Sequence, residues 1–544
     1  MNPSLRPVLV LGLDGATFDV IRPLVAAGRL PNLARWMEDG HAAPLPSTVP
    51  PMTFPSWSSF LTGLTPGEHG MFDFTQKLPG RYRLRFTNAT DRNGHSLYRR
   101  VSDAGGSVLA LGMPATFPPE KINGLLVCGF DAPVSTGTDA SSASDPSLYR
   151  SVASRTGPWM RPDLDEGAEG DEDAWHEHAI DVLLGRVRRK TDFALEALRQ
   201  LRDASSLPAL VNVIYSESDT VAHHFWRDHD PGSPRHDPTA SAKRLGAVAA
   251  VYEALDAACG ELHDAMGPGT ACVIVSDHGT GGAGRNVVHL NRYLETCDLL
   301  ARSGGGAAAS RLARGARDTA LRLLPPRVAQ AVFRRVRPAA ARLESAARFG
   351  GFDWRRTAAF SEEANTQPGV WLNLAGREEE GSIGAGDAER VRREVIDALL
   401  DWKLATGEPV VARARPREEV YRGPFVDRAP DIVVELGQDA GYGLSLVQTP
   451  WPTAPQAIRK LADDELAGGR GRGMNGVHRP EGVWIGPDEL GAPAAMPRVA
   501  HALLLALGVA SGNSVGGDTP ALRAYSEEED AIVAARLRKL GYLE

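Results

Sequence analysis

The sequence predicts an α/β fold built around a mostly parallel sheet, on two observations. Short, almost wholly apolar runs rich in Val, Ile and Leu end abruptly in Asp, Gly or Ser, as is typical of parallel strands covered by helices on both faces. Segments with apolar residues at helical spacing alternate with these runs, and such alternation favours an open, mostly parallel sheet. Ligands of such sheets bind beyond the carboxyl ends of the strands, so we expect the chemistry there.

The predicted strands fall into an early and a late set. The early runs cover residues 8–13, 108–113, 125–129, 210–215 and 272–276. A helix is predicted over 248–266, where apolar residues recur every three or four positions. The late runs cover residues 370–374, 432–436 and 483–486. We therefore expect one catalytic α/β core in two parts, 1–300 and 351–544, interrupted by an insertion over 301–350.

Two segments depart from the pattern of strands and helices. Residues 134–171 begin rich in Ser, Thr and Asp and predict a surface excursion, with an acidic helix start near Asp171. Residues 301–350 carry eleven arginines, and Pro325-Pro326 divides them into two helical pieces. We interpret this second segment as an inserted helical cap. A helix pair with a solvated arginine face is preferred to peripheral membrane contact through the same arginines.

Composition narrows the classes of protein to which the chain can belong. The 544 residues are 42% apolar and 24% charged, which is typical of a globular protein. The formal net charge of −8 argues against a general nucleic-acid-binding surface. The apolar run at 8–13 is too short for a signal peptide, no stretch approaches the ~18 apolar residues of a membrane helix, and the four cysteines form no CxxC pair. A cytoplasmic location is therefore predicted.

Two clusters near the N-terminus contain candidate catalytic groups. Asp14 ends the first apolar run, although Asp-Gly after a strand is by itself ordinary turn chemistry. Residues 50–63 predict a proline-punctuated turn followed by a helix, with Thr53 at or just before the helix start. Backbone N–H groups and the helix dipole favour an anion at that point. Taken alone, Thr53 or Ser56 would instead be interpreted as a helix N-cap.

Three further clusters supply candidate metal ligands. Asp219 and His223 are four residues apart, so on a helix both side chains point to one face. Asp277 and His278 end a buried run, where an unpaired carboxylate and imidazole would be costly without a metal ion. His478 follows a glycine-rich loop that can place one more imidazole over the site.

Together these residues predict a two-metal site. Carboxylates and imidazoles without thiolates suit two divalent ions such as Zn²⁺ or Mn²⁺. The predicted ligand sets are Asp219, His223 and His478 for one ion, and Asp14, Asp277 and His278 for the other. The hydroxyl of Thr53 would lie between the ions, because a threonine needs such activation to act as a nucleophile.

The order of these motifs resembles the type I phosphodiesterase/nucleotide pyrophosphatase family of the alkaline-phosphatase superfamily. The motifs are Asp14-Gly15, Thr53-Phe-Pro leading to Thr62-Gly-Leu-Thr-Pro-Gly-Glu-His69-Gly70, Asp219-x3-His223, Ser276-Asp-His-Gly279 and Gly476-x-His478. They span the chain from residue 8 to about residue 486. The resemblance implies an alkaline-phosphatase-like three-layer sandwich, two zinc ions in the ligand sets given above, and a covalent phospho-enzyme intermediate on Thr53.

The resemblance also guides the assignment of residues near the nucleophile. In the nucleotide pyrophosphatases an asparagine further along the nucleophile helix helps to hold the phosphoryl oxygen, whereas the first turn here offers serines. We assign Ser56 to substrate binding and expect Trp57 to shape the pocket, while His69 is expected to be structural. The implied activity is hydrolysis of a phosphodiester or phosphoanhydride bond in a small-molecule phosphate ester.

Other activities stay open from the sequence. A phosphomonoesterase, a phosphonate hydrolase or a phosphoryl transferase of the same superfamily would use the same ligands. Sulfatases of this fold are disfavoured, because Thr53-Phe-Pro-Ser does not match their Cys/Ser-x-Pro-x-Arg motif. An inactive protein that binds a phosphorylated ligand is disfavoured because every proposed ligand is present.

Overall fold

The computed structural model describes residues 6–133, 140–159, 172–204, 207–303, 348–364, 368–450, 456–466, 474–509 and 525–539. The chain divides into two compact units, and each is described separately. Unit 1 comprises Met1–Met71, Asn88–Gly282 and Met474–Arg523, and unit 2 comprises Phe72–Thr87, Ala283–Gly473 and Ala524–Glu544. Most of the predicted helical cap, 304–347, lies outside the described residues, so the cap and the predicted domain limits stay predictions.

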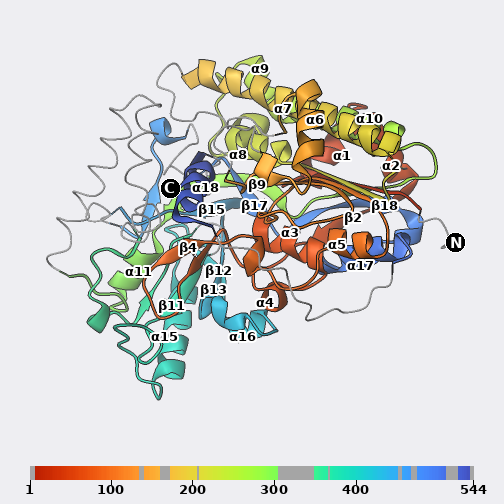
Figure 1. Ribbon diagram of the computed structural model, residues 1–544. Coiled ribbons are helices and arrows are strands. Elements are labelled where there is room, and N and C mark those ends of the chain that lie inside the picture. The colour runs from red at the N-terminus through yellow and green to blue at the C-terminus, as the bar shows by residue number, and fades with distance from the viewer. Residues whose placement is uncertain are drawn as a thin grey trace. The chain divides into compact units, whose positions relative to one another are not determined.

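Unit 1 is built around a seven-stranded sheet with the order β2-β18-β8-β1-β7-β5-β6 (Figure 1). Its strands are β1 Val8–Leu13, β2 Gly40–Pro46, β5 Val108–Met113, β6 Gly124–Cys128, β7 Leu210–Tyr215, β8 Ala271–Val275 and β18 Glu481–Pro487. β1 runs parallel to β7 and β8, and β5 runs parallel to β7 and β6. β18 is antiparallel to both β8 and β2. The predicted mostly parallel sheet is confirmed.

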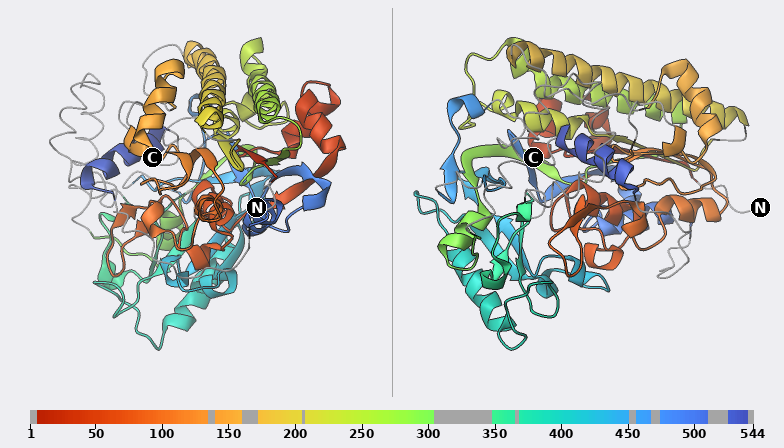
Figure 2. Two further views of the ribbon diagram at one scale, coloured as in Figure 1. Left: turned by 45° about the vertical axis from the view of Figure 1, so that its right-hand side comes forward. Right: turned by 60° about the vertical axis from the view of Figure 1, so that its left-hand side comes forward.

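Helices cover both faces of this sheet, which gives the predicted three-layer sandwich (Figures 1 and 2). The helices of one face are α3 Thr53–Thr62, α5 Leu97–Asp103 and α17 Pro497–Ala506; those of the other are α7 Glu172–Ala204, α8 Glu217–His229 and α10 Ala247–Met266. Alternate strand residues such as Val8 and Val10 pack with Trp57, Phe60 and Leu503 on the first face. Each such side chain stabilises the fold by roughly 1.5–3 kcal/mol on burial.

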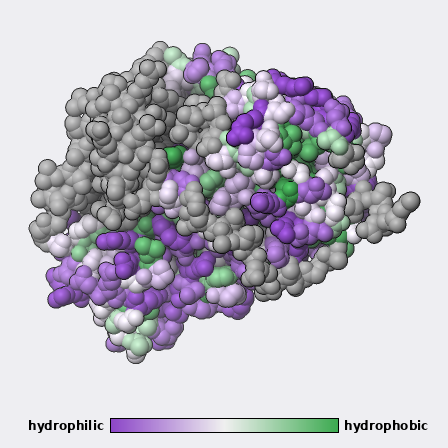
Figure 3. All heavy atoms as spheres, in the orientation of Figure 1, coloured by the Kyte–Doolittle hydropathy of each residue, from purple (hydrophilic) through white to green (hydrophobic). Residues whose placement is uncertain are grey.

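The remaining elements of unit 1 surround this sandwich. They include α1 Phe18–Ala26, α2 Pro31–Glu38, α4 Pro66–His69, α6 Pro146–Thr156, α9 Ala242–Leu245 and β17 Gly476–Arg479. α6 lies within the predicted surface excursion and packs against α7, while residues 134–139 and 160–171 lie outside the described part. Exposed ion pairs such as Arg188–Asp192 lie on α7. Figure 3 shows a hydrophilic area over α7 and α10.

Unit 2 contains two main sheets. One is antiparallel, with the order β10 Ala359–Phe360, β11 Gly369–Leu372, β13 Ile432–Leu436 and β12 Val411–Pro416. The other contains β14 Gln438–Asp439, β15 Tyr442–Leu446, β9 Gly279–Val288 and β16 Ile458–Lys460. A small hairpin pairs β3 Thr75–Lys77 with β4 Leu84–Phe86. The first four residues of β9 belong to unit 1, where they pair with β17.

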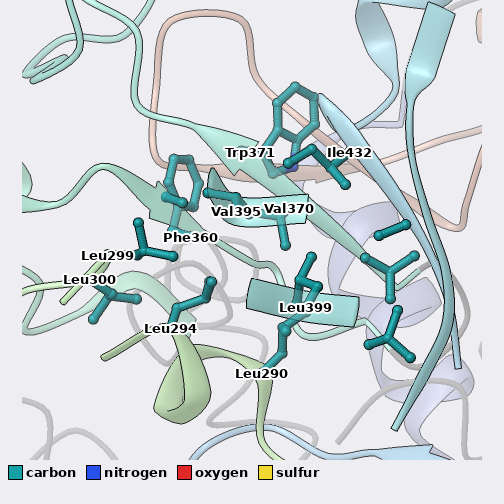
Figure 4. Packing of buried hydrophobic residues seen from close by; sticks show 14 of the residues in the cluster. Leu290, Leu294, Leu299, Leu300, Phe360, Val370, Trp371, Val395, Leu399 and Ile432 are labelled. Carbon is teal, nitrogen blue, oxygen red and sulfur yellow. The ribbon is translucent and has the colours of Figure 1, made fainter. Parts of the chain in front are cut away.

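The core of unit 2 is formed where helices pack on the antiparallel sheet (Figure 4). Among its described residues, the α-helices of this unit are α11 Leu290–Thr296, α15 Ala388–Asp401, α16 Arg417–Val420 and α18 Glu527–Lys539. Leu290 and Leu294 from α11 meet Leu399 from α15, with Phe360 and Val370 from the strands. Among the helices that the structure describes, none is both long and apolar enough to cross a membrane.

Candidate metal centre and nucleophile

The polar residues predicted to carry the chemistry follow three neighbouring strands. Asp14 comes directly after β1, and Asp277 and His278 follow β8. Asp219 and His223 lie one turn apart on α8, which begins soon after β7 ends. Because β1 lies between β7 and β8 and all three run parallel, their carboxyl ends meet at one edge of the sheet.

These side chains form one buried cluster with His478, which β17 carries. Asp219 Oδ1 lies 3.1 Å from His223 Nε2 and 3.6 Å from His478 Nε2. The Nε2 atom of His278 lies 3.6 Å from Asp14 Oδ1, and the rings of His278 and His478 stack with centroids 3.7 Å apart. All six predicted carboxylate and imidazole ligands therefore come together, since Asp277 Oδ2 also lies 3.4 Å from His278 Nε2.

Two overlapping groups within this cluster can each hold a metal ion. The first is Asp219, His223 and His478, with ligand atoms within 4.8 Å of one another, and it equals one predicted set. The second is Asp14, Asp219 and His278, so Asp219 stands in both groups. Asp277 was predicted in this second set; its Oδ2 faces His278, while its Oδ1 accepts a hydrogen bond of 3.2 Å from the amide of Gly15.

The three imidazoles are oriented as metal ligands. The Nδ1 atoms of His223, His278 and His478 lie 2.8, 3.0 and 3.0 Å from the backbone carbonyls of Gly476, Gly279 and Pro51. A carbonyl oxygen only accepts, so each Nδ1 carries a hydrogen and each ring points its Nε2 into the cluster. His223 Nε2 and His478 Nε2 face each other at 3.1 Å, which is favourable only with a proton or a cation between them.

The electrostatics of the cluster also call for a cation. Burial, reinforced by the charge of Asp277, raises the pKa of Asp14 well above its ordinary value. Burial raises the pKa of Asp277 in the same way. Burial also acts to raise the pKa of Asp219, but the imidazoles led by His223 outweigh it and hold that pKa below its ordinary value. Three buried carboxylates at one point are costly unless positive charge compensates them.

Among the residues that the structure describes, the buried polar atoms of this region without a hydrogen-bond partner include Asp14 Oδ1, Thr53 Oγ1, Asp277 Oδ2 and His278 Nε2. Buried polar groups are almost always paired in folded proteins, so these atoms indicate a missing partner. A set of carboxylate, imidazole and hydroxyl donors without thiolates fits divalent ions such as Zn²⁺ and Mn²⁺.

Thr53 is the first residue of α3 and is fully buried. The N-cap of this helix is Met52, which makes no side-chain capping bond. The alternative interpretation of Thr53 or Ser56 as a helix cap is therefore wrong. The Thr53 hydroxyl has no hydrogen-bond partner in the part of the chain that the structure describes. The carbonyl of Pro51, two residues earlier, accepts from His478 Nδ1 and so ties the start of the helix to the cluster.

Ser56 and Trp57, predicted to contact the substrate, have other partners in the structure. Ser56 Oγ donates to the carbonyl of Asp277 at 2.7 Å. Trp57 is fully buried, and its Nε1 donates to Asp14 Oδ2 at 3.1 Å. Both contacts join α3 to metal-ligand segments. Substrate contact by these two residues stays a prediction, and the observed bonds favour a role in positioning Thr53 and Asp14.

The turn after β1 passes so close to α8 that it requires a glycine. Gly15 has a φ of +64°, and a Cβ there would lie 2.8 Å from Asp219 Oδ1 and 3.0 Å from Thr280 Oγ1. Thr280 Oγ1 donates to the Gly15 carbonyl at 2.6 Å, and Ser218 Oγ donates to the Asp14 carbonyl at 2.6 Å. These bonds fix Asp14 and Asp219 relative to each other.

His69 lies outside the cluster. It is fully buried; its Nδ1 accepts from the Met71 amide at 3.1 Å and its Nε2 lies 3.0 Å from Ser59 Oγ on α3. Burial, together with the charge of Arg92, lowers the pKa of His69 to about 3. The ring is therefore neutral and braces α3, which fits the structural role expected for it.

Several supporting residues were not found from the sequence. Lys190 on α7 forms a buried ion pair with Glu217 at the start of α8, with Nζ 2.9 Å from Oε1. Arg235 and Asn475 hold the segment before His478. Glu217 stands within the Asp219 motif and was visible there, but nothing in a helix rich in charged residues distinguishes Lys190.

Comparison with known proteins identifies the family of the chain. The family model described as type I phosphodiesterase/nucleotide pyrophosphatase matches residues 8–453. The chain belongs to this family. It is thus a hydrolase of the phosphodiesterase/nucleotide pyrophosphatase type. No curated protein matches the chain.

Several solved structures are similar to this family member. A phosphonoacetate hydrolase from Sinorhizobium meliloti 1021, in complex with phosphonoacetate, has a TM-score of 0.51 and 17% identity, over 93% of this chain and 96% of that chain. Murine ectonucleotide pyrophosphatase/phosphodiesterase 5, in complex with AMP, has a TM-score of 0.44 and 12% identity, over 94% and 97%. The human protein of the same name has a TM-score of 0.46 and 12% identity, over 94% and 97%.

Proposed function

We propose that this family member hydrolyses phosphodiester or phosphoanhydride bonds of a small-molecule phosphate ester through a covalent phospho-threonine intermediate on Thr53. The observation that carries the proposal is the environment of the Thr53 hydroxyl. This hydroxyl is buried and lacks a hydrogen-bond partner in the described part of the chain. Thr53 is also the first residue of α3, and hydrogen bonds join the start of this helix to the carboxylate and imidazole cluster. A hydroxyl without a structural task at this point is explained by a chemical one.

The cluster would hold two divalent ions, which we propose to be Zn²⁺, with Mn²⁺ as the alternative. Asp219, His223 and His478 would hold one ion. Asp14, Asp277 and His278 would hold the other, and the Thr53 hydroxyl would be shared by the two ions. Bound ions would supply the positive charge that activates the Thr53 oxygen and stabilises the leaving oxygen of an in-line displacement.

In the proposed reaction the Thr53 hydroxyl loses its proton to solvent, and Oγ1 forms a bond to phosphorus. The bond from phosphorus to the ester oxygen breaks, and that oxygen leaves with the electron pair and takes up a proton. Water then attacks phosphorus, the bond to Oγ1 breaks, and the threonine oxygen is protonated again. The N-terminus of α3 stabilises negative charge on the phosphoryl oxygens.

The neighbours of Thr53 would keep its oxygen in line. Ser56 and Trp57 lie within the first turn and a half of α3 and bind the segments that carry Asp277 and Asp14. A displacement of about 1 Å can cost roughly 100-fold in rate, so these two bonds matter for catalysis without substrate contact.

The proposed location is cytoplasmic. All four cysteines are free thiols; Cys128, Cys259 and Cys272 are buried and Cys297 is half-buried. Unpaired cysteines in a chain of this length are typical of a reducing compartment, which supports the proposal.

The test compares hydrolysis of bis(p-nitrophenyl) phosphate with that of p-nitrophenyl phosphate by protein loaded with Zn²⁺ or Mn²⁺. Thr53→Ala should lower kcat by at least about 1000-fold, because the nucleophile is lost. Thr62→Ala is the matched control, since Thr62 ends the same helix, and its hydroxyl donates to the Ser58 carbonyl and accepts from the Leu64 amide, both away from the cluster. Full metal-dependent activity in Thr53→Ala would refute the nucleophile.

The same assay separates the bond types. Faster cleavage of the diester supports the proposal, whereas faster cleavage of the monoester would identify a phosphomonoesterase. Phosphonoacetate belongs in the substrate panel, because a solved structure of the same fold is a phosphonoacetate hydrolase. Acid quenching during turnover, followed by mass spectrometry of the peptide that contains Thr53, should reveal the phosphorylated threonine.

A further inference from the structure

Arg235 is among the largest fully buried side chains of the protein, and it lies beside the segment that leads to His478. The residue follows the C-terminal end of α8 and is 1% exposed. Its Nη1 donates to the carbonyl of Met474 at 2.9 Å and to Asn475 Oδ1 at 3.3 Å. A planar guanidinium can serve two acceptors at once, so it fixes the backbone and the side chain of this segment together.

Asn475 connects Arg235 to α8 through hydrogen bonds. With its Oδ1 held by Arg235, its Nδ2 points to the other side and donates to the His224 carbonyl at 3.0 Å. Its backbone amide donates to the His223 carbonyl at 2.8 Å. One buried amide thus joins the strand segment to two consecutive residues of the helix that bears Asp219 and His223.

The next residue reaches the metal-ligand group itself. The carbonyl of Gly476 lies 2.8 Å from His223 Nδ1 and sets the orientation of that ring. The approach is close enough that a Cβ on Gly476 would lie 2.7 Å from the Ala222 carbonyl. Two residues later His478 presents its Nε2 at 3.1 Å from His223 Nε2.

We propose that Arg235 is a positioning residue for the Asp219–His223–His478 group, holding Met474 and Asn475 against α8 so that both imidazoles converge on one ion. The inference rests on the proposed metal centre and deepens it, because it singles out one of the two ions. Asp14 and His278 are held by other elements, after β1 and β8. Loss of Arg235 should therefore weaken the binding of one ion and leave the binding of the other unchanged.

The experiment titrates the full chain, stripped of metal by a chelator, with Zn²⁺ and with Mn²⁺ against a chromophoric competitor. Arg235→Met keeps an unbranched apolar stem of similar path and removes the guanidinium donors. We expect one of two metal equivalents to bind about 10–100-fold more weakly, the size of effect found when the partner of a metal-binding histidine is removed. Arg235→Lys, which keeps one donor, should recover part of the loss.

Reference variants identify the weakened equivalent. It should be the one that His478→Ala removes, and not the one that His278→Ala removes. The double variant Arg235→Met/His478→Ala should show no further loss of that equivalent, because both changes act on one group. Hydrogen exchange of the Asn475 amide should also accelerate in Arg235→Met, since its bond to His223 loosens.

Arg92→Met is the matched control for a merely structural effect. Arg92 is also buried and donates to a backbone carbonyl, that of Ala115, in another part of unit 1. The Arg92→Met variant should have a lower melting temperature and should bind both metal equivalents with wild-type affinity. If Arg235→Met does not fold, Asn475→Ala removes the same link at its other end and should weaken the same equivalent.

Three results would overturn the inference. If Arg235→Met or Asn475→Ala bound two metal equivalents with wild-type affinity, the hydrogen bonds between Arg235 and Asn475 would not position His223 and His478. Equal weakening of both equivalents, matched by Arg92→Met, would reduce the role of Arg235 to general stability. Absence of metal binding by the wild-type chain would overturn the proposed centre, and the inference with it.

Discussion

Acid should destabilise this protein partly through a single buried imidazole, that of His69. Burial and the nearby Arg92 lower its pKa to about 3, against 6.5 for an ordinary histidine. The folded state therefore binds a proton less readily than the unfolded chain. The stabilising contribution is complete above pH 6.5 and is lost as the pH falls from 6.5 toward 3, because the unfolded chain takes up the proton first.

The size of the effect follows from the two pKa values. Each pH unit between them costs ~1.4 kcal/mol of unfolding free energy. At pH 4.5 the unfolded histidine has gained two units while the folded one is still neutral, so the loss relative to pH 7 is about 2.5 kcal/mol. That is a large part of the ~5–15 kcal/mol by which a domain is stable.

Urea unfolding at pH 7 and at pH 4.5 measures this loss. His69→Gln lacks the titrating group, so its unfolding free energy should fall by about 2.5 kcal/mol less than that of the wild type over the same interval. His41→Gln, a change at an exposed position, should keep the wild-type pH dependence. An equal fall in His69→Gln and wild type would refute the reasoning, as would a His69 ring that titrates near pH 6.5 in the folded protein.

Two further predictions concern the supports of the metal ligands. Gly15→Ala should reduce metal content and activity at least about tenfold, because the new Cβ would lie 2.8 Å from Asp219 Oδ1 at a residue with positive φ. Metal analysis after dialysis measures this loss, and a metal content equal to that of the wild type would contradict the prediction. Lys190→Met should lower the unfolding free energy by about 3–5 kcal/mol, because it leaves the Glu217 carboxylate buried without its cation. In urea unfolding, the double variant Lys190→Met/Glu217→Leu should regain most of the lost unfolding free energy. A double variant no more stable than Lys190→Met would contradict this reasoning.

Much of the central sheet could be predicted from the sequence, for a physical reason. β1, β5 and β7 are buried on both faces, so their residues are almost all apolar and their limits stand out. β2 was not predicted, because it is an edge strand with exposed residues and two prolines. β9 contains four glycines in ten residues and shows no hydrophobic pattern at all.

The candidate site shows the same division. Asp219 and His223 were predicted to share a helical face, and α8 confirms it. The hydrogen bond from Trp57 Nε1 to Asp14 could not be predicted, because the sequence around a tryptophan in an apolar helix does not indicate which acceptor its indole N–H contacts. The partition into two units was equally hidden, since the short segment Phe72–Thr87 leaves unit 1 and returns to it. Such links depend on tertiary contacts, which sequence patterns of short range do not encode.

The place of β18 in the sheet has a consequence for how the enzyme is made. This late strand pairs with β8 on one side and β2 on the other, and β17 just before it carries His478. A ribosome releases Asp14 and Thr53 hundreds of residues before these segments emerge. The nascent chain would hold an open sheet edge and an incomplete ligand set for most of its synthesis. Both are completed only once these late segments have emerged, so the full ligand set cannot bind metal before then.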